Sequence, residues 1–336
     1  MNKKALIILL FIIVAVNTYA QQGIVLSQPY ISSQFLSPAT VGNGIYEHRI
    51  QTNLKSQFLD GNNFYRTLVS GWDSRFKNAD SDQENYFGVG AQIISDQAMG
   101  GLFNSNYISL GFAYHLFLDA NLKNELSLGI GGTYGQAYLD RSKLRFSEGF
   151  NIDGSYTAGN YDYLNNIKSS PQNFYYNTGL LFTRHTENLF LQGGLAASFL
   201  SKPKVLILNV DTASGMKSSA FFNFEKVFES GNTFMTHLSF VNKNGLNQIV
   251  VGGLWSFPFK DKADKINRMY VGCFNRLEDA IIPSVSIMMD KYTLGLSYDI
   301  YNNDLSGAKL KQNGFEIALS VSFGKKRNEW MRTIFD

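Results

Sequence analysis

The sequence has little cysteine, little proline and little net charge. Its 336 residues include six prolines and one cysteine, Cys273. A single cysteine excludes an intramolecular disulfide framework. The formal net charge is only +3, which gives no support for the concentrated basic face that nucleic-acid binding needs. After residue 20, no apolar run approaches the length of a membrane-spanning helix, so a helical membrane protein is excluded.

The first twenty residues have the three-part layout of a secretory signal peptide. Two lysines precede the apolar run at residues 5–16, and small residues lead up to Ala20. The run is about a dozen residues long, whereas a helix needs ~20 residues to span a bilayer. We therefore expect export, with residues 1–20 removed by cleavage between Ala20 and Gln21. An uncleaved membrane anchor is the alternative.

Strand-like alternation is what the sequence has in abundance. In the segment "KYTLGLSYDIYNND", residues 291–304, small and polar side chains occupy one face. The other face carries Tyr292, Leu294, Leu296, Tyr298 and Ile300. The same period of two recurs at residues 107–118, 125–135 and 314–323. Each segment is about ten residues long or slightly longer, which is the length that a tilted strand needs to cross a membrane.

The number and spacing of these segments predict a closed barrel. They start near residues 46, 64, 84, 106, 125, 173, 189, 216, 232, 247, 266, 281, 291 and 313. About fourteen antiparallel strands fit a bacterial outer-membrane barrel, in which long outer loops alternate with short periplasmic turns. The connections alternate in this way, with long ones at 141–172, 202–215 and 302–312 and tight ones at 186–188, 229–232 and 290–291.

Residue chemistry favours a membrane barrel over a soluble β-sandwich, which is the alternative all-β fold. The outer face of a soluble sandwich carries Lys, Glu, Asp and Thr. Here the non-apolar face is mostly Gly, Ala, Ser and Thr, and charges gather in connections such as 260–265. Trp72 and Trp255 lie at segment ends, as in interfacial girdles. We predict an all-β fold, a transmembrane antiparallel β-barrel of the outer-membrane type over residues 46–323.

No constellation of catalytic, metal-binding or cofactor-binding residues stands out. The four histidines lie on different predicted strands without the spacing of metal ligands. The glycine-rich segment 129–135 lacks the Lys-Ser/Thr that completes a phosphate loop. We therefore expect no catalytic residue, no metal and no cofactor. An outer-membrane enzyme is the least favoured alternative.

The segment at residues 21–45 is expected in the periplasm, before the barrel, and is the candidate plug. It is apolar and carries no charge, and such a surface needs a partner. Fourteen tilted strands enclose a radius of roughly 14 Å, which Gly, Ala, Ser and Thr side chains cannot fill. The hypothesis is that this segment blocks part of the lumen through Tyr30, Phe35, Leu36 and Pro38. A poorly packed leader is the alternative. The tail at residues 324–336 is expected in the periplasm, outside the barrel wall.

Several segments together resemble the PorP/SprF family of Bacteroidota outer-membrane proteins. The segment "LSQPYISSQFLSPATVG", residues 26–42, is similar to the family's Asn-Pro-Ala-Tyr-Ala-Gly type motif. Pro38, Ala39 and Gly42 match that motif, whereas Ser37 and Thr40 differ from it. Residues 271–323 carry "DAIIPSV", "LGLSYDI", "DLSGA" and "GFEIALS" in the family's order and spacing. The resemblance spans most of the chain after residue 20 and is strong at both ends.

The resemblance implies a role in type IX secretion, in the outer membrane, and implies no reaction. The expected partner is a secreted protein with a type IX C-terminal signal domain, such as a gliding adhesin, which the barrel would bind, help to export or anchor. Outer-membrane lipid and periplasmic secretion or gliding components are further expected partners, and no nucleic acid is expected. The outer loops at 141–172 and 202–215 are favoured for binding. The alternative function is an outer-membrane solute transport channel, although the sequence lacks the opposed charge rows expected in a porin lumen.

Overall fold

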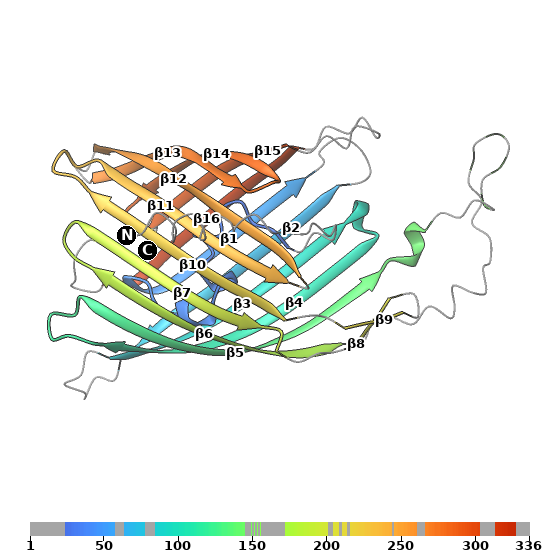
Figure 1. The fold of residues 1–336 in the computed structure, drawn as a ribbon, viewed down its shortest axis with the longest axis horizontal. Coiled ribbons are helices and arrows are strands. Elements are labelled where there is room, and N and C mark those ends of the chain that lie inside the picture. Colours follow the sequence, from blue (N-terminus) through green and yellow to red (C-terminus); the bar gives the residue numbers. More distant parts are fainter. Residues whose placement is uncertain are drawn as a thin grey trace, which may run out of the picture.

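Alternating apolar and polar residues build the strands of a closed barrel in the computed structural model of this chain (Figure 1). The structure describes residues 24–57, 64–77, 85–144, 149, 151, 153, 155, 172–200, 204–207, 210–213, 216–243, 245–260, 266–302 and 313–326. Within these residues, no helix is long and apolar enough to cross a membrane.

In the described part of the chain, fourteen antiparallel strands follow one another around the barrel, and the first pairs with the last. They are β1 (Tyr46–Gln57), β2 (Tyr65–Phe76), β3 (Tyr86–Ala98), β4 (Phe103–Phe117), β5 (Asn124–Leu139), β6 (Asn173–His185), β7 (Leu189–Ser198), β10 (Lys217–Val227), β11 (Thr233–Lys243), β12 (Leu246–Lys260), β13 (Ile266–Arg276), β14 (Ala280–Met289), β15 (Tyr292–Tyr301) and β16 (Asn313–Lys326). Every strand begins within three residues of its predicted start. The predicted fold is therefore confirmed.

The two faces of each strand border different surroundings, as the alternation predicts. On β15, Leu294 and Leu296 point outward, whereas Thr293 and Ser297 are buried on the inner side. Closing the sheet pairs the backbone groups of every strand, so the outer band can face hydrocarbon without exposing an unpaired strand edge.

The chain after β7 and the tight turns after β6 and β10 lie at opposite ends of the barrel. In Figure 1 the two short strands that follow β7 lie to the right, and the turns after β6 and β10 lie to the left. We assign the tight-turn end to the periplasm and the other end to the cell surface, following the general pattern of outer-membrane barrels. A two-stranded sheet that the sequence did not predict, β8 (Lys204–Ile207) with β9 (Val210–Ala213), lies in the connection after β7.

The last strand is longer than predicted. β16 continues to Lys326, three residues past the predicted end of the barrel at Phe323. Gly324 adopts a φ of +87°, and the register of β1 against β16 shifts near Tyr46, so pairing resumes beyond the irregularity. The rest of the predicted tail, residues 327–336, lies outside the described residues. So do Ala20, Gln21, most of the loop at 141–172 and part of the loop at 202–215.

The lumen and the N-terminal segment as the candidate functional site

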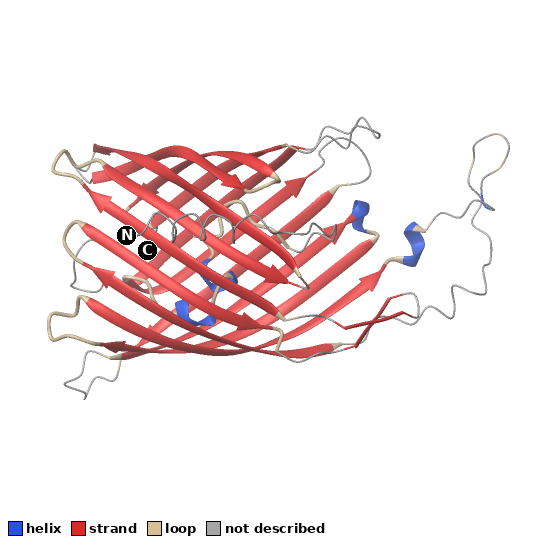
Figure 2. Cartoon of the chain, viewed as in Figure 1, coloured by secondary structure: helices blue, strands red, loops and turns tan. Residues whose placement is uncertain are grey.

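The chain before β1 lies inside the barrel. We call its described part, residues 24–45, the leader. Two short 3₁₀ turns, Ser33–Phe35 and Pro38–Thr40, shape it, and they are the blue turns inside the ring of strands in Figure 2. Ile31 and Ala39 are fully buried, at 0% exposure. The apolar surface of residues 24–45 packs against the lumen wall, which is where the hypothesis of a plug puts this segment.

The leader runs along the height of the barrel. Near its end, Gly42 donates its backbone N–H to the Asp73 carboxylate at 2.6 Å, close to the periplasmic end of β2. Near its start, Ser27 donates its hydroxyl to Asp299 at 2.6 Å, close to the outer end of β15. The residues between these two contacts cross the lumen.

One apolar cluster joins the leader to the wall formed by the later strands. The Tyr30 ring lies 5.2 Å from the ring of Phe274 and 5.5 Å from that of His237. Together with Tyr30 and Ile31, the buried cluster contains Phe190, Met235, Val250, Leu254, Tyr270, Phe274, Ala280, Ile282 and Ala318. Burial, with a smaller contribution from the Glu316 carboxylate, raises the pKa of the Tyr30 phenol, so this ring enters the cluster uncharged.

A second apolar cluster joins the leader to β2, β3, β6 and β10. It contains Leu26, Phe35, Leu36 and Ala39 of the leader with Val69, Ile94, Leu181 and Phe221 of the barrel. Lys217 lies 3.7 Å from the centroid of the Phe35 ring and donates to the Phe35 carbonyl at 2.8 Å. Of the four candidate plug residues, Tyr30, Phe35 and Leu36 are buried and Pro38 is half-buried. The leader thus packs against the wall in both clusters.

Polar contacts hold the outer part of the leader. The two carboxylate oxygens of Glu316 accept the backbone N–H groups of Ser27, at 2.6 Å, and Gln28, at 2.9 Å. Asn53 donates to the Gln28 carbonyl at 3.1 Å and to Glu316 at 2.7 Å. Lys55 donates to the Ser27 hydroxyl at 2.8 Å. We call these three wall residues, together with Asp299, the outer latch.

A different set of polar contacts holds the periplasmic part. Arg49 pairs with Asp73 at 2.9 Å and also donates to the Thr40 carbonyl at 3.3 Å. Asn43 donates its side-chain amide to Glu125 at 2.5 Å. The leader is therefore anchored near both ends by buried charged side chains of the wall.

The charge of the lumen differs from the sequence-based expectation. We expected inward residues to be mostly small and the lumen to lack opposed charges, and that expectation is wrong. Lys55 and Arg276 both pair with Asp299, at 2.7 and 2.8 Å, and all three are almost fully buried. Asp299 is the only charged residue on β15, whereas Lys55 shares the inward face of β1 with Arg49, and Arg276 shares that of β13 with Arg268. Each of these residues occupies an inward-facing position in the alternation of its strand, and this pattern could have revealed them.

The small inward residues mark the path of the leader. A Cβ atom added at certain glycines of the wall would overlap leader atoms. The overlaps are Gly88 with the Val41 oxygen at 2.0 Å, Gly295 with Gln28 Oε1 at 2.2 Å, Gly129 with the Ala39 nitrogen at 2.3 Å and Gly179 with Ser37 Oγ at 2.3 Å. Glycine at these positions lets backbone and side-chain atoms of the leader lie directly against the wall.

One buried cluster contains the residue types of a catalytic triad without its geometry. Ser127 Oγ and Glu125 Oε1 both approach the same nitrogen of His115, Nδ1, at 2.7 and 3.1 Å. The other nitrogen, Nε2, lies 2.8 Å from the Val41 carbonyl oxygen. A triad needs the serine and the acid on different nitrogens, and it needs an open face for substrate. All three side chains are fully buried, and two of them, His115 and Glu125, contact the leader. Within the described residues, no group of His, Cys, Asp and Glu could hold a metal ion.

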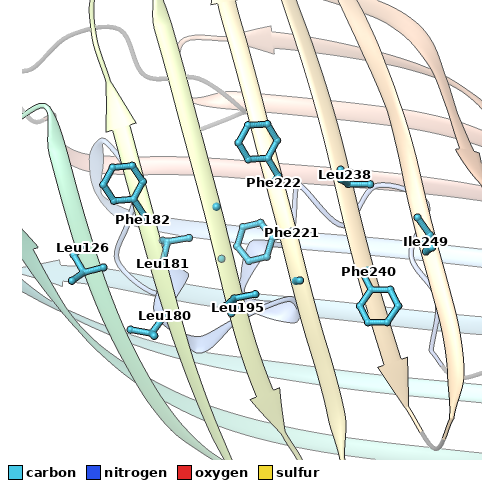
Figure 3. Close-up of a pocket in the computed structure, with 13 residues that line it drawn as sticks. Leu126, Leu180, Leu181, Phe182, Leu195, Phe221, Phe222, Leu238, Phe240 and Ile249 are labelled. Atoms are coloured by element: carbon cyan, nitrogen blue, oxygen red, sulfur yellow. The ribbon is translucent and has the colours of Figure 1, made fainter. Parts of the chain in front are cut away.

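A cavity of about 610 Å³ lies on the outer side of the wall (Figure 3). Thirteen apolar residues of β5, β6, β7, β10, β11 and β12 line it, including Leu195 and Phe222. Most of its lining side chains face outward, whereas Leu181 and Phe221 belong to the cluster that packs against the leader, and no lining residue is polar. It adds no group that could perform chemistry.

Comparison with models of protein families identifies the family of this barrel with a leader in its lumen. The family model for the type IX secretion system membrane protein PorP/SprF matches residues 18–321. The chain belongs to this family. A PorP/SprF protein with a closed barrel of this kind is an outer-membrane component of type IX secretion. No curated protein matches the chain.

This PorP/SprF chain is also similar to several solved barrels, each at low identity. The toluene transporter TodX of P. putida is 9% identical with a TM-score of 0.44, over 88% of this chain and 94% of TodX. The KdgM porin is 12% identical with a TM-score of 0.36, over 82% of this chain and 99% of KdgM. CdiB from Acinetobacter baumannii is 9% identical with a TM-score of 0.40, over 82% of this chain. The match spans only 60% of the length of CdiB. Similarity at this level carries no argument about function.

Proposed function

We propose that this barrel is a non-enzymatic component of the type IX secretion and gliding machinery. It binds a secreted surface protein through that protein's C-terminal signal domain, and so helps to export or anchor it. The observation that carries the proposal is the family match, which extends over residues 18–321 and so covers the leader and nearly the whole barrel.

In this proposal the leader is a plug. Its support is the packing of Tyr30 in one apolar cluster and of Phe35 and Leu36 in a second, with polar anchors near both ends. A lumen filled with packed side chains resists the diffusion of solutes, because protein interiors of this kind leave few voids larger than a water molecule. The same feature argues against the alternative function, a solute transport channel.

The partner then binds at the outer end of the barrel, on the connections at 141–172 and 202–215. The second connection contains β8 and β9, so part of it is an ordered strand pair beyond the wall. Loops carried by a rigid barrel are common binding elements, because the scaffold fixes where their ends lie. A filled lumen leaves this outer end as the surface that an exported protein meets.

Loop replacement with recovery of bound proteins tests this assignment. Residues 204–213 are replaced by a Gly-Ser linker of equal length in the producing cell, and the tagged barrel is purified from native membranes. A matched control replaces the tight periplasmic turn at 229–232. We expect both variants to assemble, and only the 204–213 variant to lose the co-purifying surface protein and its display on the cell.

Two results would contradict the proposal. One is that the surface protein is fully retained both when residues 204–213 are replaced and when residues 145–171 are replaced. The other is a deletion strain in which surface proteins are displayed normally while uptake of a small solute falls. The second result would favour the solute channel.

A further inference from the structure

The outer latch lies where β1 pairs with β16 and closes the barrel. We call this pairing the seam. β1 and β16 are the first and last strands, and their pairing is the one contact in the ring that joins opposite ends of the chain. In that pairing Lys55 lies directly opposite Glu316, and Asn53 lies directly opposite Ala318. Lys55, Asn53 and Glu316 all point into the lumen and are buried.

The leader bonds to both sides of this seam at once. Gln28 gives its backbone N–H to Glu316 on β16 and receives a bond from Asn53 on β1 at 3.1 Å. Ser27 gives its backbone N–H to Glu316 and accepts a bond from Lys55 on β1 at 2.8 Å. These two leader residues therefore connect the first strand to the last strand independently of the β1–β16 ladder.

Part of the hydrogen bonding of the buried Glu316 carboxylate comes from the leader. Glu316 is 0% exposed, and two of its donors are the backbone N–H groups of Ser27 and Gln28. If these two donors are lost while the lumen stays filled, Asn53 remains as a donor at 2.7 Å and the carboxylate stays buried. A buried carboxylate that loses its donors is strongly destabilising, and here the destabilised residue belongs to the closing strand.

The fit of the leader near the seam is also close. A Cβ added at Gly295 of β15 would lie 2.2 Å from Gln28 Oε1 and 2.8 Å from Ile31 Cδ1. The leader is thus in direct contact with the wall beside the seam. Such a close fit is expected of a structural element and not of a loosely inserted tail.

From these contacts we infer that the leader is an internal clasp for the β1–β16 seam. Ser27 and Gln28 hold the first and last strands together, in addition to any plugging of the lumen. This function of the leader is separate from partner binding, because it acts on closure of the barrel and not on the outer loops. It also implies that the leader stays in place in the assembled protein.

Variants at the latch test the clasp. Glu316→Gln keeps the size of the side chain but replaces one accepting oxygen by an amide that cannot accept the backbone N–H. We expect the temperature at which the barrel loses its compact form on a gel to fall by roughly 5–10 °C. The matched control is Ser219→Ala on β10, which removes a leader hydrogen bond, to the Leu36 carbonyl at 2.5 Å, far from the seam. The control should lower that temperature by about 2–4 °C.

A disulfide across the seam separates the clasp from general destabilisation. In a Cys273→Ser background, Thr52→Cys with Leu319→Cys joins directly opposed residues of β1 and β16. Phe222→Cys with Leu238→Cys joins directly opposed residues of β10 and β11 as the control. We expect the seam disulfide to restore the thermal stability of Glu316→Gln, and the control disulfide to leave it low.

Equal rescue by both disulfides, or no rescue by the seam disulfide, would overturn the inference. If Glu316→Gln does not assemble, Ser27→Ala replaces it in the same comparison. That variant removes only the hydroxyl that links Lys55 of β1 to Asp299 of β15. Loss of partner binding with unchanged thermal stability of the latch variants would also contradict the clasp, and would leave the outer-loop proposal untouched.

Discussion

Arginine placed on the outer face of β16 tests which side of the wall meets lipid. Leu319 lies in the middle of the strand, is 41% exposed on the bare barrel, and is flanked by Thr52 and Leu294 on the neighbouring strands. If this position lies near the bilayer centre, Leu319→Arg should reduce the free energy of folding by about 2–4 kcal/mol. The cost comes from carrying a guanidinium into hydrocarbon.

The matched variant is Phe323→Arg, on the same face of the same strand. Phe323 lies four residues from Leu319, which is roughly 13 Å along a strand and roughly 10 Å along the membrane normal at a tilt near 40°. Half of a hydrocarbon core measures about 15 Å, so Phe323 lies close to the interface. Arginine there should cost about 0–1 kcal/mol. The difference between the variants, about 1–4 kcal/mol, corresponds to roughly a 5- to 900-fold change in the folding equilibrium.

The assay is reversible unfolding by denaturant in lipid vesicles. The slope of unfolding free energy against denaturant concentration should equal that of the wild type, which checks the two-state behaviour of each variant. Equal costs at Leu319 and Phe323 would refute the assigned depth. A negligible cost at both positions would refute the lipid-facing assignment of this strand face.

Three further predictions concern the lumen. Gly129→Ala should destabilise the barrel by about 1–3 kcal/mol, because the added Cβ would meet the leader backbone. In the same unfolding assay, Gly193→Ala should be close to neutral, because the nearest atoms lie 3.9 Å from the added Cβ. Tyr30→Ala should lower stability by about 3–5 kcal/mol and raise single-channel conductance, and an unchanged conductance in an assembled variant would count against the plug. Arg49→Ala should lower the free energy of unfolding by about 3–5 kcal/mol, because it leaves the buried Asp73 without its charged partner. The double variant with Asp73→Ala should recover part of that stability, and additive effects of the two substitutions would show that the pair is not coupled.

The strands could be predicted from the sequence because lipid and lumen impose opposite demands on alternate residues. Where both demands act, as on β15 and β16, the period of two is continuous and the strand starts are predicted well. β8 and β9 were not predicted, because four-residue strands beyond the membrane are under no such demand. The extension of β16 past Phe323 was missed because Gly324 and two lysines interrupt the alternation.

The candidate site was only partly predictable. The apolar leader at residues 24–45 indicated that it needs a partner surface, but its path inside the barrel depends on contacts between residues far apart in sequence. Ser27 meets Glu316 across 289 positions, and no local pattern links them. Inward charges such as Asp299 and Lys55 were overlooked because they lie on strands far apart in sequence, and only the closed barrel brings them together.

A disulfide between the leader and the wall tests the central claim that the leader occupies the lumen. In a Cys273→Ser background, Ser37→Cys is combined with Gly179→Cys, whose Cβ would lie 2.3 Å from the present Ser37 Oγ. The control pair is Ser37→Cys with Gly193→Cys, on the lipid-facing side of β7. The account predicts that only the first pair forms an intramolecular disulfide in the membrane-assembled protein, and that single-channel conductance stays low before and after oxidation. A first pair that remains reduced, in an assembled barrel with an open conductance, would contradict the account.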